Sequence, residues 1–283
     1  MPYPKRPLEF YGLPVVSPPS EEMRRALAEQ VCPFRGRRCI KVRKSNPEQT
    51  IGACVVGFQG DAILTCPYRM TDRGTIFVNA ARLLSEDAQE RGRVIRVVPE
   101  VTMPGGSIDY FVVAFDNLGQ VIDFVGLEIQ TLDTTGSSGI WQCREDLAAG
   151  RPLATSYSYG MNWKMTAKTI LMQILHKAGT FELLGKKLVL AIQYEFFDYL
   201  RRNFRFEHVR PADNADPVHF HVYHVGRRPD SRLQLTLGAP YSVPAAAIPE
   251  MIHGSDEAVS FAEAARRISL KAHAAFDLVP VTG

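Results

Sequence analysis

Three polar side chains interrupt an apolar stretch between residues 107 and 131. Asp109, Glu128 and Gln130 stand among valine, isoleucine and phenylalanine in SIDYFVVAFDNLGQVIDFVGLEIQT. Two carboxylates that meet on a largely apolar surface repel each other and lose solvation, so they need a proton or a cation. A divalent metal meets this need where hard oxygen ligands gather. The pattern therefore indicates a metal site, provided that the fold brings the two acids together.

A β-hairpin is the element that would position these acids. The tetrapeptide Asp-Asn-Leu-Gly at 116–119 is a turn signal, because Asn and Gly tolerate positive φ between two runs rich in Val, Ile and Phe. It predicts strands over residues 107–115 and 120–132.

The register of this hairpin decides which side chains meet. The turn places Phe115 opposite Gln120, which sets Asp109 across from Gly126. Glu128 is then the diagonal neighbour of Asp109 on the same face, roughly 7–8 Å away in an ideal sheet. Side-chain alternation keeps the polar residue at 130 on that face too. Because antiparallel sheets often expose one face to water, a solvated pair of acids stays open as the alternative.

Most of the cysteines fall between residues 32 and 66. They are Cys32, Cys39, Cys54 and Cys66. Four thiolates can close a tetrahedral site for zinc or iron. The spacing contains no C-x-x-C pair, so a set of small buried hydrophobic residues is the alternative interpretation. Cys143 stands apart in the apolar sequence IWQC and is expected to pack in a core.

Basic side chains gather in two segments that could contact a polyanion. The first lies between residues 32 and 44, which contain no acid, and the second between 164 and 187. The candidates are Arg35, Arg37, Arg38, Lys41, Lys164 and Lys177. Such residues neutralise the phosphates of nucleic acids, although a solvated helix face is the alternative for the lysines. The net charge of +3 is too small to identify a polyanionic partner.

The histidines of the segment HFHVYH also suggest a metal site. His219 and His221 share a face of the predicted strand, whereas His224 has the opposite parity. Histidines that hydrogen-bond or face solvent are therefore the favoured interpretation.

Length and composition set broad limits. A chain of 283 residues with 46% apolar content can bury a sizeable core, in one large domain or two modest ones. It has no run of 18 apolar residues, so no membrane span is expected. The N-terminal sequence MPYPKRPLEFYG lacks the apolar segment of a signal peptide, which predicts a cytoplasmic, reducing compartment.

Helical and strand patterns alternate along the chain, which predicts an α/β fold with a mixed sheet. The proline-rich residues 1–20 are expected to form an extended arm. Helices are expected at 21–30, 80–90, 164–180, 195–204 and 256–271. Further strands are expected at 94–100, 186–193, 218–225 and 233–237.

Several of these segments occur in an order that resembles a known nuclease family. The order of these features resembles the core of the PD-(D/E)xK nucleases: a strand that carries an Asp, a hairpin turn, and a strand that carries Glu-x-Lys or Glu-x-Gln. More closely, the chain resembles the NotI restriction endonuclease family over residues 30 to 200. The segments that carry the resemblance are CPF (32–34), CPYR (66–69), IDYFVV (108–113), DFVGLEIQ (123–130), NWK (162–164) and QILHKAGTFELLGKK (173–187).

The resemblance implies a fold and a division of the chain. It implies a mixed α/β sheet of the PD-(D/E)xK type, flanked by helices, in a catalytic domain over 71–283 with a C-terminal extension. An N-terminal arm and a tetracysteine metal-binding segment would occupy residues 1–70. The metal there would be structural iron or zinc, with iron in the known member of the family.

The resemblance also implies an activity: a Mg²⁺-dependent type II endonuclease that cleaves double-stranded DNA as a homodimer. Asp109 and Glu128 become ligands of the catalytic Mg²⁺, and Glu100 becomes the upstream acid. Gln130 takes the place usually held by lysine. A neutral amide can orient an attacking water, but it supplies no positive charge.

Two other functions stay open from the sequence. One is a metal-stabilised DNA-binding protein without chemistry, in which the cysteine segment and the basic run bind DNA. The other is a nuclease of the same superfamily that works in DNA repair or on mobile elements without strong sequence preference.

Overall fold

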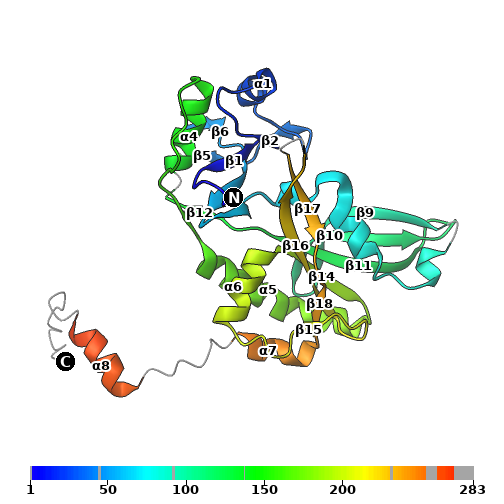
Figure 1. Cartoon of the computed structure of the whole chain (residues 1–283). Coiled ribbons are helices and arrows are strands. Elements are labelled where there is room, and N and C mark those ends of the chain that lie inside the picture. The colour runs from blue at the N-terminus through cyan, green and yellow to red at the C-terminus, as the bar shows by residue number, and fades with distance from the viewer. Residues whose placement is uncertain are drawn as a thin grey trace, which may run out of the picture.

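The computed structural model describes residues 2–43, 46–90, 93–136, 138–229, 232–252 and 260–270. Within these ranges, an eight-stranded mixed sheet carries helices, and a lobe containing the N-terminus lies at one end of it (Figure 1). The mixed α/β class that the sequence predicts is confirmed.

The large sheet is antiparallel at both edges and parallel in the middle. Its strand order is β15–β18–β16–β14–β11–β10–β9, with β17 also paired to β16. The three strands β11, β14 and β16 are parallel, and their other neighbours are antiparallel. The bounds are β9 Val94–Met103, β10 Gly106–Phe115, β11 Val121–Gln130, β14 Lys187–Gln193, β15 Arg210–Pro211, β16 Val218–Arg227, β17 Leu233–Leu237 and β18 Tyr241–Val243. In Figure 1 the hairpin strands β9, β10 and β11 extend away from the body of the molecule.

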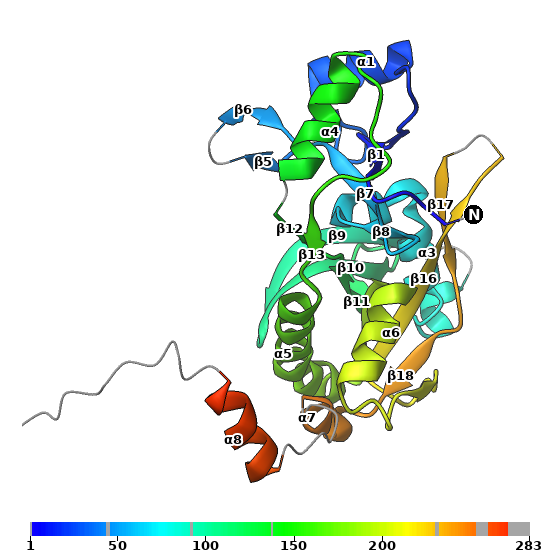
Figure 2. The same cartoon turned by 60° about the vertical axis from the view of Figure 1, so that its left-hand side comes forward.

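Helices α5 (Trp163–Leu183) and α6 (Tyr194–Asn203) cover one face of this sheet, as Figure 2 shows. The α5 face is apolar at helical spacing, which the sequence pattern predicts. Phe181 of α5 stacks on Phe111 of β10, with ring centroids 6.2 Å apart. Gly126 of β11 makes this approach possible, because a Cβ there would lie 2.4 Å from the Phe181 ring.

The opposite face packs against α3 (Thr75–Ala81), which contributes Ile76 and Ala80 to the core. The helix predicted at 80–90 is therefore mostly wrong. After Ala81 the chain makes a turn and a short 3₁₀ segment, Asp87–Gln89. The Asp123 carboxylate of β11 accepts a hydrogen bond from the Ser85 backbone N–H at 2.7 Å, and this long-range contact fixes the non-helical path.

The N-terminal lobe is built on a four-stranded sheet, β2–β1–β7–β8. The predicted arm is extended, but it forms the strands β1 and β2 of this sheet. Helix α1 begins as predicted, because the Ser20 Oγ accepts a hydrogen bond from Met23 N at 3.1 Å. The lobe contains β1 Pro7–Phe10, β2 Leu13–Pro14, α1 Glu21–Glu29, β3 Val31–Cys32, β4 Arg37–Arg38, β5 Val42–Arg43, β6 Asn46–Thr50, β7 Ala53–Phe58, β8 Asp61–Leu64 and α2 Pro67–Met70.

A later segment of the chain returns to this lobe. In Figure 2, helix α4 (Ser138–Ala148) lies beside α1. Arg144 of α4 donates to the Leu27 carbonyl at 3.0 Å, and the Tyr157 N–H donates to the Lys5 carbonyl at 2.8 Å. The lobe is therefore assembled from residues on both sides of position 70, the boundary expected from the sequence.

A buried arginine fixes the lobe to the large sheet. Arg69 of α2 pairs with Glu9 of β1 at 2.7 Å, with 4% and 0% of the two side chains exposed. The same guanidinium donates to the Leu233 carbonyl of β17 at 2.6 Å. Removing one partner of such a buried pair typically costs about 3–5 kcal/mol. The CPYR segment thus has a structural role through its arginine.

The remaining elements are short or lie near the C-terminus. They are η1 Asp72–Gly74, β12 Thr134–Thr135, β13 Gly160–Met161, η3 Ala245–Ala247, α7 Ile248–Met251 and α8 Phe261–Ser269. Helix α8 matches the centre of the last predicted helix, whose ends at 256–259 and 271 lie outside the described residues. Within the ranges given above, the longest apolar helices fall short of what a bilayer span requires.

Candidate active site

The hairpin predicted around residues 107–132 is present. The turn is held by Asp116, whose Oδ1 accepts hydrogen bonds from Leu118 N and Gln120 N, both at 2.8 Å. Gly119 has φ of 79°, as the turn signal requires. Strands β10 and β11 follow on either side.

The register differs from the predicted one by two residues. Phe115 pairs with Val121, and a β-bulge between Ala114 and Phe115 adds a second offset, so that Tyr110 lies opposite Leu127. The paired ladder ends at Tyr110 and Leu127, and Asp109 and Glu128 are the next residues on the two strands. Because the total offset is even, the acids stay on one face, side by side instead of diagonal, and the Asp109 charge acts on Glu128.

Asp109 has an acid on each neighbouring strand. Its Oδ2 accepts a hydrogen bond from the Ile129 backbone N–H at 2.9 Å, which holds the carboxylate against β11. On the other side, Tyr110 pairs with Pro99 and Ile108 with Val101, which places Glu100 opposite Asp109. Glu100 is exposed and has φ of 51°, a strained value that L-residues rarely adopt. The structure therefore brings the three predicted acids together.

A lysine from α5 completes the group. Lys177 Nζ lies 2.7 Å from Glu128 Oε1, with only 5% and 6% of the two side chains exposed. The sequence suggests Lys177 as a phosphate contact, whereas the structure places its ammonium in a buried pair with an acid. The sequence pattern that could have indicated this inward position is the apolar helical stripe of Ile170 and Ile174, which continues three residues further to position 177.

Tight packing fixes the helix that carries Lys177. At Gly105, in the turn between β9 and β10, φ is 94° and a Cβ would lie 2.4 Å from the His176 carbonyl oxygen. Next to it, the Thr180 hydroxyl donates to the Pro104 carbonyl at 2.9 Å. Only glycine allows this approach of the turn to α5. The β9–β10 turn and the helix therefore hold Lys177 at the level of the acids.

Gln130 lies half-buried on the same face of β11 as Glu128. Its Nε2 donates to the Thr131 carbonyl at 2.7 Å. This bond uses one of the two N–H groups of the amide, and the amide oxygen can still accept a hydrogen bond.

Burial dominates the electrostatics of the two central acids. The pKa of Glu128 is raised to about 7; burial is the main cause, the contact with the Lys177 ammonium opposes it, and the Asp109 charge adds to the rise. Burial also raises the pKa of Asp109; the Ile129 N–H and Lys177 oppose this, and Glu100 adds to it. One lysine therefore does not offset the acids, and the site favours a further proton or cation. Two carboxylates, completed by waters and a phosphate, suit Mg²⁺, which rarely binds to a cage made of protein alone.

The raised pKa of Glu128 predicts how stability depends on pH. Between 4.5 and about 7 the folded state holds a proton on Glu128 that the unfolded chain has lost, so this residue's contribution falls as pH rises through that window. The difference between these two pKa values corresponds to about 3 kcal/mol in the free energy of unfolding. The stability of metal-free protein, measured by urea unfolding, is expected to fall by this amount between pH about 5 and about 8. The Glu128→Gln protein lacks this titrating group, so its stability should fall by about 3 kcal/mol less over the same range. Equal pH slopes for the two proteins would contradict the raised pKa of Glu128.

The four clustered cysteines lie near one another in the N-terminal lobe. Cys54 and Cys66 share a hydrogen bond, which lowers the pKa of Cys66 to about 6 and raises that of Cys54. Burial raises the pKa of Cys32, to which the charges of Cys66 and Cys39 also contribute. Thiol donors of this kind suit zinc or iron. Across the described ranges, however, no three metal-binding side chains are arranged to hold one ion, so the metal at the cysteines stays a prediction.

The other predicted phosphate contacts differ in exposure. Arg37 and Arg38 on β4 and Lys164 at the start of α5 are exposed. Arg35 is half-buried, with its guanidinium 4.5 Å from the centre of the Tyr68 ring. Lys41, also half-buried, donates to the Thr65 carbonyl. The three exposed residues are thus the most accessible to a nucleic acid.

The histidines and the isolated cysteine have structural environments. His219 Nε2 lies 3.0 Å from the Asp216 carbonyl oxygen, and burial lowers the pKa of His221 to about 4. The His224 ring stacks on Tyr194, with centroids 4.9 Å apart. These contacts favour packing over metal binding. Cys143 is fully buried in the core, as the sequence predicts.

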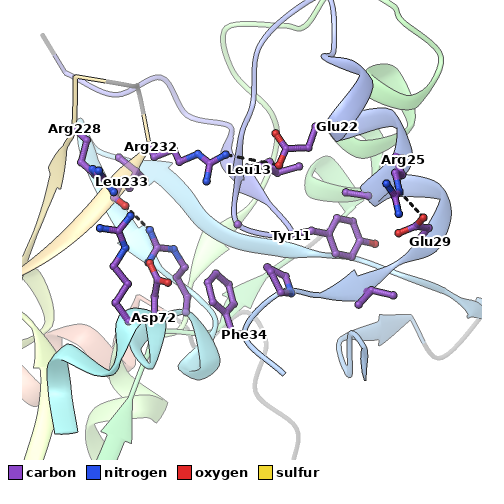
Figure 3. Close-up of a pocket in the computed structure, with 16 residues that line it drawn as sticks. Tyr11, Leu13, Glu22, Arg25, Glu29, Phe34, Asp72, Arg228, Arg232 and Leu233 are labelled. Atoms are coloured by element: carbon purple, nitrogen blue, oxygen red, sulfur yellow. Dashed lines mark hydrogen bonds and ion pairs between the residues drawn. The ribbon is translucent and has the colours of Figure 1, made fainter. Parts of the chain in front are cut away.

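A pocket of about 430 Å³ lies elsewhere, between α1 and the ends of β16 and β17 (Figure 3). Its lining includes Arg25, Arg228 and Arg232, together with acids that face them. Arg25 pairs with Glu29 at 2.7 Å, and Arg232 lies 3.7 Å from Glu22. The acids of this pocket are thus already matched by arginines. The hairpin is the stronger candidate for cation-dependent chemistry.

The fold and the site define a class of protein: an α/β protein whose central hairpin gathers carboxylates beside a buried lysine. Residues 20–235 match the family described as Restriction endonuclease NotI. Because this match covers most of the chain, the chain belongs to the NotI restriction endonuclease family, and the resemblance seen in the motifs is confirmed. Members of such a family are site-specific nucleases that act on DNA. No curated protein sequence matches the chain.

Proposed function

We propose that the protein is a type II restriction endonuclease that uses Mg²⁺ to hydrolyse phosphodiester bonds at a specific double-stranded DNA sequence. One observation carries this proposal: Asp109 and Glu128 lie next to each other just beyond the paired part of the hairpin, where they carry more negative charge than Lys177 offsets. The family match supplies the substrate class, and the acid pair supplies the means of hydrolysis. The order of an Asp strand, a hairpin and Glu-x-Gln supports a PD-(D/E)xK type of core.

Asp109 and Glu128 would hold the Mg²⁺. When bound, the metal polarises the scissile phosphate and lowers the pKa of a water molecule. The chain contributes position: the Ile129 N–H fixes the Asp109 carboxylate, and strand backbone holds both acids more precisely than a loop would. The Gln130 amide oxygen would accept a hydrogen bond from a water molecule and so orient it. Glu100, which is exposed and lies opposite Asp109, would be the further acid beside the metal-binding pair.

The exposed basic residues would position the DNA backbone. Arg37 and Arg38 on β4 and Lys164 on α5 present their charges to solvent. Contacts of this kind with phosphates set orientation and register without reading sequence. A homodimer would supply two acid pairs, one for each strand of the duplex, and two-fold symmetry suits a symmetric target.

The proposal is tested by incubating purified protein with plasmid DNA and Mg²⁺, then sequencing the ends of the products. We expect discrete fragments whose ends share one sequence, and no cleavage when EDTA replaces Mg²⁺. Ends without a common sequence would instead identify a nuclease of low specificity. DNA binding without cleavage would identify a binding protein.

A further inference from the structure

We propose that Lys177 is an internal counter-ion of the active site, which neutralises Glu128 until a divalent cation arrives and displaces it. This inference rests on the proposed function, because it concerns the same acids. It adds a step to metal loading: Mg²⁺ competes with an ammonium group of the protein for Glu128.

The first support is the cost of placing a lysine at this position. Lys177 is 4% exposed and lies in the stripe of α5 that otherwise packs Ile170, Ile174 and Phe181 on the sheet. An apolar residue would suit this packing, whereas a buried ammonium needs a partner to offset its lost hydration. Glu128 is that partner, at 2.7 Å. Lys177 therefore compensates the charge of the acids, and it is not needed for apolar packing of the core.

The second support is the balance of charge. Asp109 and Glu128 carry two negative charges when ionised, and in the described part of the chain Lys177 is the cation whose charge acts on both. Lys177 supplies one positive charge, so the group of three residues still carries one negative charge in excess. A divalent cation matches both carboxylates, and it repels an ammonium that contacts the same oxygen. Metal and lysine therefore cannot both occupy the Glu128 oxygen.

The third support is the kind of side chain. Lysine is a compact charge on a flexible four-carbon stem, so its ammonium can leave one acceptor for another while the helix stays fixed. Gln130, on the same face of β11 as Glu128, is neutral. The released ammonium of Lys177 would stay in the same group of residues and supply the positive charge that Gln130 lacks.

Calorimetric titration of the full-length protein with Mg²⁺, in the absence of DNA, tests this inference. Lys177→Met removes the charge and keeps an unbranched side chain. It is expected to tighten Mg²⁺ binding at least about tenfold, because the competitor is gone, while DNA cleavage at saturating Mg²⁺ falls by about a hundredfold. The matched control is Lys168→Met, an exposed lysine on the same helix, which should leave Mg²⁺ binding unchanged. If Lys177→Met does not fold, Lys177→Gln takes its place with the same expectation.

Other results separate the failure of this inference from that of the proposed function. Weaker or unchanged Mg²⁺ binding in the Lys177 variant would overturn the counter-ion role, because a lysine that only supports the fold does not compete with the metal. In a Glu128→Gln background the gain in affinity should vanish, and its persistence would also overturn the role. Wild-type protein that binds no Mg²⁺ through Asp109 and Glu128 would overturn the proposed function itself.

Discussion

Asp109→Asn and Glu128→Gln are each expected to lower the rate of DNA cleavage by about a thousandfold or more, with the fold intact. Each change removes one negative charge from a site with two central carboxylates, and Mg²⁺ is held in proteins by only one or two such groups. In the Asp109→Asn protein, the oxygen of the new amide can still accept the hydrogen bond from Ile129 N that holds the present carboxylate. Cleavage of a plasmid, timed at saturating Mg²⁺, measures the effect.

Three comparisons make this result specific. Glu182→Gln, an exposed acid on α5, should cleave at the wild-type rate. DNA binding by the Asp109→Asn protein should persist and tighten, because a carboxylate near the phosphate has been removed. Gln130→Ala should slow cleavage less than the acid variants, because orienting water is one part of the stabilisation of the transition state. A folded Asp109→Asn protein that cuts at the wild-type rate would refute the assignment.

Cys54→Ser is expected to unfold the N-terminal lobe if the four cysteines hold a structural metal, as the sequence predicts. Structural zinc contributes about 10–16 kcal/mol in small domains, as much as the whole stability of a typical protein. Serine is a poor ligand for zinc or iron, so the metal and its contribution would both be lost. Elemental analysis gives the metal content, and circular dichroism with thermal unfolding gives the stability.

Cys143→Ala provides the control for the cysteine experiment. Cys143 is fully buried but lies in α4, apart from the four clustered thiols. The variant should keep one iron or zinc per chain and lose only the small packing energy of a buried sulfur, about 1–2 kcal/mol. Wild-type protein that contains neither metal after purification would exclude the structural metal site.

The elements with strong local signals were predictable from the sequence. Turn chemistry at 116–119 predicts the β10–β11 hairpin, and Ser20 predicts the start of α1. The helical stripe predicts α5, and the same stripe passes through Lys177, so periodicity alone could have placed this lysine inward. Its basic character favoured a surface role instead, because lysines are seldom buried without a partner.

Features that depend on distant contacts were not predictable. The helix expected at 80–90 ends early because Asp123, far along the chain, binds Ser85. The pair of Arg69 with Glu9 joins residues 60 positions apart, and no local pattern marks it. The hairpin register likewise depends on a bulge that strand propensity does not encode.

The bulge and the turn together bear on how this hairpin can change in length during evolution. Their combined offset is even, so Asp109 and Glu128 share a face. A single inserted or deleted residue between 115 and 121, if it shifted the ladder, would turn one strand over and separate the acids onto opposite faces. A change of two residues would slide the strands and keep both acids on the same side. The connecting segment can therefore lengthen or shorten in steps of two, and relatives of this chain should differ there by even numbers of residues.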